Sequence, residues 1–220
     1  MASKSRRNKA TFKWTKELIF LISFVAVLVI VTIVLAIPSS AKRTLNKYNE
    51  AITTYNSANS TSYTTLTNDN VFEEIGGGYD QQVNNVMNIA KNNEYTYVFY
   101  GSLTDSVFLE QLSSINNIAK EYEVNKVYIF LSNYVSDAEK KEETSTISYK
   151  QKIDEYNKTL NENKNEDCEE FDMSLHPALL VYKDGGLLFN TQVDTESKYT
   201  WSQYITLAFG FEQEAKNSAQ

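Results

Sequence analysis

Residues 95–108 read Tyr-Thr-Tyr-Val-Phe-Tyr-Gly-Ser-Leu-Thr-Asp-Ser-Val-Phe, and this stretch decides the fold class. Its first six residues are aromatic or β-branched, which is the composition of a buried strand. Gly101 interrupts this run, and from Thr104 onward the apolar residues recur at helical spacing. Thr104 suits the N-cap of such a helix, and Asp105 suits the positive end of its dipole. The stretch therefore predicts a strand that turns directly into a helix.

Two further strands are predicted beside this unit. Residues 126–132 form a second apolar and β-branched run, and a strand–helix–strand of this length gives two parallel strands with a right-handed crossover. Upstream, residues 71–75 form a short apolar stretch that ends at three glycines. The residues between these glycines and position 95 have apolar side chains on one face, which predicts a helix.

The C-terminal part predicts a hairpin and a helix. Two apolar runs, 178–183 and 187–192, flank Asp184-Gly185, the strongest short-range hairpin signal. A last helix has its apolar face at Trp201, Tyr204, Ile205 and Ala208. The order β-α-β-α-β-β-α makes this an α/β domain, which we place at residues 67–212, with a short tail at 213–220.

Residues 136–170 interrupt this order with a charged segment of mostly helical propensity. Its apolar stripe is narrow and consists of Ile147, Ile153, Tyr156 and Leu160. We therefore expect it to pack loosely on the edge of the domain.

The N-terminal part predicts a membrane anchor. Residues 1–16 carry a charge of +6 with no acidic residue, and residues 17–37 contain an apolar run long enough to cross a bilayer. Because positive charge stays on the cytoplasmic side, we expect a single-pass signal anchor with the C-terminal domain outside the cytoplasm. The small residues at 39–41 leave a cleaved signal peptide as the alternative. Residues 38–66 are polar and are expected to form a stalk, with Leu45, Tyr48, Ile52 and Tyr55 on one helical stripe.

The composition narrows the range of partners. The whole chain has a net charge of −7, so the part after residue 16 carries −13. An acidic body argues against nucleic acid, which needs basic groups along its phosphates. The single cysteine, Cys168, leaves no intramolecular disulfide.

Three local matches resemble the thioredoxin family, and the resemblance covers residues 67–212. Residues 98–102 (Val-Phe-Tyr-Gly-Ser) resemble the strand before the family's redox turn, and residues 176–182 resemble the strand that its cis-proline enters. Residues 183–186 (Lys-Asp-Gly-Gly) resemble its hairpin. The family's Cys-x-x-Cys would follow Thr104, but Asp-Ser-Val-Phe stands there, so no thiolate is available to begin disulfide exchange. The chain thus resembles a membrane-anchored bacterial member of this family that lacks the redox motif.

The resemblance implies a shallow groove for extended polypeptide. In the family, the cis-proline and the residue before it face the redox motif across this groove. Carried over, His176 and Pro177 would face four residues at the start of the helix, namely Asp105, Ser106, Val107 and Phe108. We expect no cofactor and no metal, because His176 is the only histidine and no calcium-loop motif is present.

Three single residues have a catalytic interpretation beside a structural one, and the structural one is preferred in each case. His176 could pair with Asp105 as an acid–base couple, although a histidine bonded to a backbone carbonyl is more common. Ser106 could be a nucleophile, although a residue in a first helical turn is more often a cap or solvated. Cys168 lies among four acidic residues, which should raise its pKa and disfavour the thiolate.

Three functions follow in order of preference. The first is a redox-inactive, extracytoplasmic module, not an enzyme, that binds a protein or peptide through backbone hydrogen bonds at a sheet edge and apolar contacts from Val107 and Phe108. The second is a thiol oxidoreductase or peroxidase that works through Cys168. The third is a structural surface protein that self-associates through the predicted stalk and residues 136–170.

Overall fold

The computed structural model describes residues 40–77, 79–132, 149–175, 177–192 and 199–218. Ten elements follow in the order α2 (Ser40–Asn59), β1 (Phe72–Glu74), α3 (Tyr79–Lys91), β2 (Tyr95–Gly101), α4 (Ser106–Glu121), β3 (Val127–Leu131), α6 (Tyr149–Leu160), β4 (Ala178–Lys183), β5 (Gly186–Asn190) and α7 (Trp201–Ser218). The predicted membrane anchor lies outside the described residues. Among the residues that are described, no helix is both long and apolar enough to cross a bilayer.

The strands form one mixed sheet in the order β1-β3-β2-β4-β5. The pairs β1–β3 and β2–β3 are parallel, as predicted for the β2–β3 crossover, whereas β2–β4 and β4–β5 are antiparallel. Asp184 and Gly185 both have positive φ, 48° and 84°, which two-residue turns of this hairpin class require. This mixed α/β architecture fits the thioredoxin-like fold that the sequence predicted.

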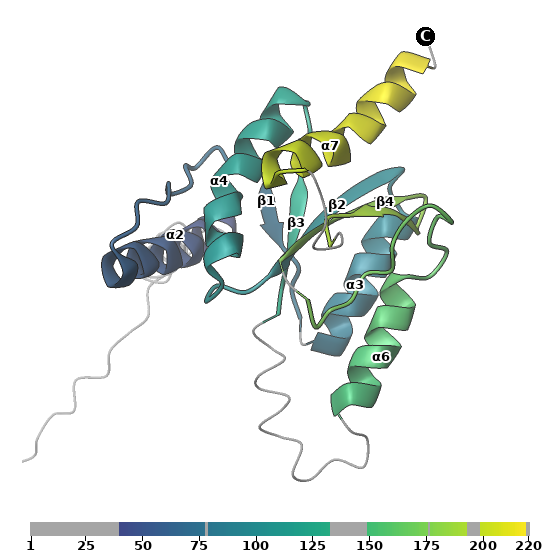
Figure 1. The fold of residues 1–220 in the computed structure, drawn as a ribbon, viewed down its shortest axis with the longest axis horizontal. Coiled ribbons are helices and arrows are strands. Elements are labelled where there is room, and N and C mark those ends of the chain that lie inside the picture. The colour runs from purple at the N-terminus through teal and green to yellow at the C-terminus, as the bar shows by residue number, and fades with distance from the viewer. Residues whose placement is uncertain (1–39, 78, 133–148, 176, 193–198, 219–220) are drawn as a thin grey trace, which may run out of the picture. The chain divides into compact units, whose positions relative to one another are not determined.

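Helices cover both faces of the sheet (Figure 1). On one face, α4 packs beside α7, and on the other α3 packs beside α6. The central strand β2 serves both layers because its side chains alternate: Tyr97 and Phe99 join the α4 side, while Val98 and Tyr100 join the α3 side. Two buried cores therefore lie on either side of one sheet.

The predicted stalk is wrong for residues 40–66, because α2 belongs to the folded unit. Leu45, Tyr48 and Ile52 are at most 7% exposed and lie in the same core as α4 and α7. The stripe that the sequence showed is therefore a packing face. A single sequence reveals such a stripe but not the partner that it packs against.

Two asparagines of α2 fix the chain that follows the helix. Asn49 binds both backbone groups of Leu66, at 2.9 Å to the oxygen and 2.7 Å from the nitrogen. Seven residues later, Asn56 binds both backbone groups of Tyr63 at 2.9 Å. Each amide thus satisfies the backbone groups that a neighbouring strand would otherwise satisfy. As a result, part of the polar segment that looked like a linker is tied to the helix.

One boundary and the packing of one segment also differ from the prediction. The domain end at residue 212 falls inside α7, which continues to Ser218 and has a Glu212–Lys216 ion pair at 2.9 Å. The charged segment packs more closely than expected where it is described, because Ile153 and Leu160 are buried against the α3 side of the sheet. Residues 133–148 lie outside the described residues.

Candidate functional site

The turn at residues 101–108 joins β2 to α4 and is where the resemblance placed a redox motif. Ser102 organises it: its carbonyl accepts from the Asp105 N–H at 3.1 Å, and its hydroxyl lies 2.8 Å from the Thr104 hydroxyl. Ser102 is buried, whereas Thr104 is exposed. The turn is thus closed by its own hydroxyl and backbone groups.

Asp105, and not Thr104 as predicted, is the N-cap of α4. Its φ and ψ of −89° and 122° are extended, and its Oδ1 accepts from the N–H groups of Val107 at 2.8 Å and Phe108 at 3.3 Å. An N-cap side chain satisfies backbone donors that the helix itself leaves unpaired. Asp105 therefore has a structural role at the first position of the predicted redox motif.

Phe108 is fully buried, so the prediction that it contributes an apolar contact in an exposed groove is wrong. Its ring stacks on Phe99 with centroids 4.5 Å apart and 11° between the planes. Gly101 permits this packing, because a Cβ there would lie 2.2 Å from Phe108 Cδ2. The glycine that interrupts the strand therefore makes room for the ring at the fourth position of the motif.

The remaining predicted site residues are only partly brought together. Ser106 and Val107 are half-buried on the first turn of α4. Tyr100 pairs with Ala178 across β2 and β4, so Pro177 lies at the same end of the sheet as Gly101 and the turn. His176 lies outside the described residues, and its pairing with Asp105 stays a prediction.

A groove that the sequence did not predict lies beside the turn. Its volume is about 410 Å³, and seven residues of α2 line it together with Leu103 and Thr104. We call this the α2 groove; its lining residues are Lys47, Glu50, Ala51, Thr54, Tyr55, Ala58, Asn59, Leu103 and Thr104. Most of its lining surface is apolar. The spacing of Ala51, Tyr55 and Ala58 was the signal in the sequence, but only the packing of α2 beside the turn makes it a groove.

Cys168 is buried at 8% exposure on the other side of the sheet, beside β5. Its Sγ donates to the Glu169 carbonyl at 3.3 Å and accepts from Asn190 Nδ2 at 3.8 Å. Burial raises the pKa of this thiol, and Glu169 adds a smaller upward effect. The predicted direction is therefore correct, but desolvation, not the acidic neighbours, is the main cause.

The segment around Cys168 is held by side-chain amides. Asn161 binds both backbone groups of Phe171 at 2.8 Å, and Gln192 binds both backbone groups of Asp172 at 2.8 Å. Asn190 donates to the Glu169 carbonyl at 2.7 Å. These bonds keep the thiol covered, so a reactive role for Cys168 finds no support in this geometry.

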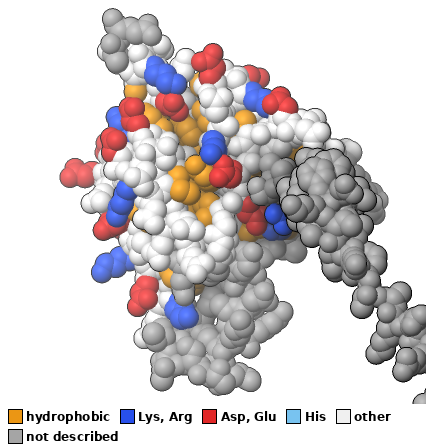
Figure 2. All heavy atoms as spheres, turned by 180° about the vertical axis from the view of Figure 1, so that it is seen from behind, with side chains coloured by type: hydrophobic (Ala, Val, Ile, Leu, Met, Phe, Trp, Pro, Cys, Tyr) orange, Lys and Arg blue, Asp and Glu red, His pale blue; other side chains and the backbone are white. Residues whose placement is uncertain are grey.

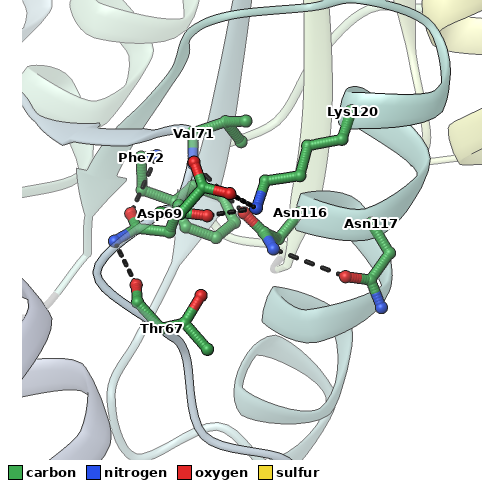
Figure 3. Close-up of polar contacts among 8 residues, drawn as sticks. Thr67, Asp69, Val71, Phe72, Asn116, Asn117 and Lys120 are labelled. Atoms are coloured by element: carbon green, nitrogen blue, oxygen red, sulfur yellow. Dashed lines mark hydrogen bonds and ion pairs between the residues drawn. The ribbon is translucent and has the colours of Figure 1, made fainter.

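The opposite end of α4 is fixed by the loop before β1 (Figure 3). Asn116 Oδ1 accepts from the Val71 N–H at 3.1 Å, and this asparagine is 6% exposed. Lys120 bonds to the Asp69 carbonyl and forms an ion pair with its carboxylate at 2.8 Å. Because both ends of α4 are held, the position of the turn relative to the sheet is fixed.

The described residues form no metal site, and the face shown in Figure 2 carries charges of both signs. Within the described ranges, no group of three or more histidine, cysteine or acidic side chains could hold a metal ion. On the face shown in Figure 2, apolar side chains come to the surface near the middle, and acidic and basic side chains are interspersed around them.

Comparisons with known proteins give little further information. No protein-family model matches the chain, and no curated protein matches it. A solved structure described as a proposed oxidoreductase with a thioredoxin fold is similar over 55% of this chain and 80% of its own, at 15% identity and a TM-score of 0.32. A likeness this weak carries no argument about function.

Proposed function

We propose that this chain is a redox-inactive, thioredoxin-like module that is anchored in the membrane, lies outside the cytoplasm and binds a protein or peptide segment. The observation that carries the proposal is the turn at 101–108. A helix cap and a buried ring occupy the two positions where the resemblance placed thiols. This arrangement supplies no nucleophile for disulfide exchange.

The α2 groove is the binding surface that the described residues support best. It combines apolar side chains of α2 with Leu103 from the turn, and Lys47 and Glu50 provide polar groups at its edge. Binding sites in proteins are commonly apolar hollows with a few polar groups that orient the ligand. Of the two polar groups at this edge, Lys47 is itself held by Glu74 in an ion pair at 2.9 Å. The membrane anchor and the extracytoplasmic location rest on the charge and hydropathy of residues 1–37 alone.

Photo-crosslinking in cells tests the binding role. A benzophenone residue placed at Thr54 samples the α2 groove, one at the half-buried Val107 samples the start of α4, and one at Glu155 on α6 is the control. We expect one protein to be captured from Thr54 and none from Glu155. Capture from Val107 alone would move the binding surface to the groove that the sequence predicted beside Pro177.

A blocking substitution shows whether the captured protein occupies the groove. Ala58→Trp fills the groove, whereas Ser57→Trp places the same ring one residue away on α2, outside the groove lining. We expect Ala58→Trp to abolish capture from Thr54 and Ser57→Trp to preserve it. Equal capture in both variants would rule out the α2 groove as the binding surface.

A further inference from the structure

The apolar lining of the α2 groove comes mainly from one face of α2. Ala51, Tyr55 and Ala58 follow one another at spacings of four and three residues, which places them side by side on a helix. Leu103 from the turn completes the apolar lining. The ring of Tyr55 stacks on that of Tyr63, with centroids 5.6 Å apart and 11° between the planes. A fixed aromatic surface is therefore part of the groove.

Among the described residues that line the groove, Lys47 is the one cation, and it is already neutralised. Its Nζ lies 2.9 Å and 3.1 Å from the two carboxylate oxygens of Glu74 on β1. The Tyr48 hydroxyl donates to the same carboxylate at 3.0 Å and helps to hold it in place. A negatively charged ligand would therefore have to displace Glu74 to reach Lys47.

Glu50, by contrast, has no cation of its own. It is exposed at the edge of the groove and forms no ion pair with any residue that the structure describes. Glu110 on α4 adds charge of the same sign nearby, because partial desolvation and the Glu110 carboxylate both raise the pKa of the Tyr63 phenol. The α2 groove thus combines an apolar lining with an excess of negative charge at its edge.

This combination favours one class of ligand. Apolar side chains that enter the groove leave water, and a cation beside them gains the attraction of Glu50 without displacing an existing partner. Arginine suits this position best, because its planar guanidinium pairs with a carboxylate through two hydrogen bonds and also stacks on aromatic rings such as that of Tyr55. The groove volume of about 410 Å³ is near the lower end of the roughly 300–1,000 Å³ of ligand sites, which suits a few side chains of a segment.

We propose that the α2 groove binds a segment of a partner protein in which an arginine stands beside apolar side chains, with the apolar side chains in the groove and the guanidinium at Glu50. This inference names the partner class of the proposed function and rests on that function. It also specifies the charge of the ligand, which the apolar lining leaves open. An acidic segment would meet Glu50 as a like charge and would find Lys47 held by Glu74.

A charge swap between groove and ligand tests the proposal. The protein is the full chain in a detergent with an uncharged headgroup, and the ligands are the peptides Gly-Leu-Leu-Arg-Leu-Gly and Gly-Leu-Leu-Glu-Leu-Gly. Each peptide has an uncharged dye, and fluorescence anisotropy measures its binding. We expect the wild type to prefer the arginine peptide. Glu50→Gln should weaken that binding about two- to five-fold, as for loss of an exposed ion pair, and Glu50→Lys should weaken it about ten-fold and reverse the preference.

Glu155→Lys is the matched control for the charge reversal. It makes the same change in net charge at an exposed residue of α6. Long-range attraction between the peptide and the whole protein therefore changes alike in both lysine variants. We expect Glu155→Lys to keep the preference of the wild type for the arginine peptide. Ala58→Trp, which fills the apolar part of the groove, should abolish binding of that peptide.

Two results would overturn this inference and leave the proposed function standing. If Thr54 captures a partner but the two peptides bind alike, or neither binds, the ligand of the groove belongs to another class. If Glu50→Lys and Glu155→Lys keep the same preference, Glu50 takes no part in binding. A third result removes the inference and the binding role of the groove together: neither peptide binds, and Thr54 captures nothing. The failures of the two proposals are therefore distinguishable.

Discussion

The turn at 101–108 and the surroundings of Cys168 each meet one half of what thiol chemistry requires. The turn lies at the positive end of the α4 dipole, with backbone N–H groups at its cap, and this environment would stabilise a thiolate. However, the turn has no thiol. Cys168 is the thiol, but it is buried and burial raises its pKa. A reactive cysteine needs activation and exposure in one place, and this chain separates them on the two sides of its sheet.

The largest effect is expected from Phe108, the last residue of the turn, whose substitution tests whether the turn is anchored in the core. Phe108→Ala removes a fully buried ring that stacks on Phe99, so it should lower the free energy of unfolding by about 3–5 kcal/mol. Urea unfolding of purified protein gives the value. A loss below about 1 kcal/mol would show that the ring is not packed as described.

The next prediction places a thiol in the environment that now lacks one. Ser106→Cys, in a Cys168→Ser background, should react with a thiol probe near neutral pH at least about ten-fold faster than Cys168 of the wild type. The helix N-terminus favours the thiolate at residue 106, whereas burial disfavours it at residue 168. Similar rates for the two thiols would show that the turn does not favour a thiolate more than the surroundings of Cys168 do.

A smaller effect is expected at the helix cap. Asp105→Ala should cost about 0.5–2 kcal/mol, because the N–H groups of Val107 and Phe108 lose their acceptor. Asp105→Asn keeps an acceptor oxygen and should recover most of this loss. Glu110→Ala, at an exposed residue of the same helix, is the control for removing a negative charge. An equal loss in the Asn variant would point to charge instead of capping.

The smallest effect concerns the dependence of stability on pH. The pKa of Cys168 is raised in the folded state above its usual value of 9.0, so the neutral thiol's contribution to stability is present below that pH. As pH rises above about 9, the unfolded chain loses this proton first and stability falls, by at most about 1.4 kcal/mol per pH unit. Cys168→Ala should remove this part of the slope in unfolding experiments between pH 8 and 11. An unchanged slope would mean that the thiol titrates alike in both states.

The sequence predicted the strands and the hairpin well, because their signals are local. An aromatic and β-branched run over 95–100 can bury both faces, and Asp184-Gly185 supplies the two positive φ angles of the turn. The role of Phe108 was missed for the opposite reason. Its burial depends on Gly101 and Phe99, and a helical residue seven positions after a glycine does not reveal that the two will meet.

The candidate site was predicted only in part. The sequence predicted that the strand at 95–101 turns directly into a helix, and β2 and α4 are joined in this way. That this turn corresponds to the redox turn of the thioredoxin family stays a prediction. The α2 groove was missed because it joins residues 47–59 to residues 103 and 104, and one sequence carries no signal for that long-range contact. The interpretation of residues 38–66 as a stalk failed in the same way, since a polar segment with one apolar stripe fits both a free helix and a packed one.

By itself, the sequence determined the order of the elements, the hairpin, the lack of a redox motif and the charge of the N-terminal part. These are properties of residue type and near-neighbour spacing. Only the tertiary structure decided that α2 belongs to the core and that Cys168 is covered. Each of those depends on which distant surfaces exclude water from one another, and the free energy of that burial is a property of the pair of surfaces and not of either segment alone.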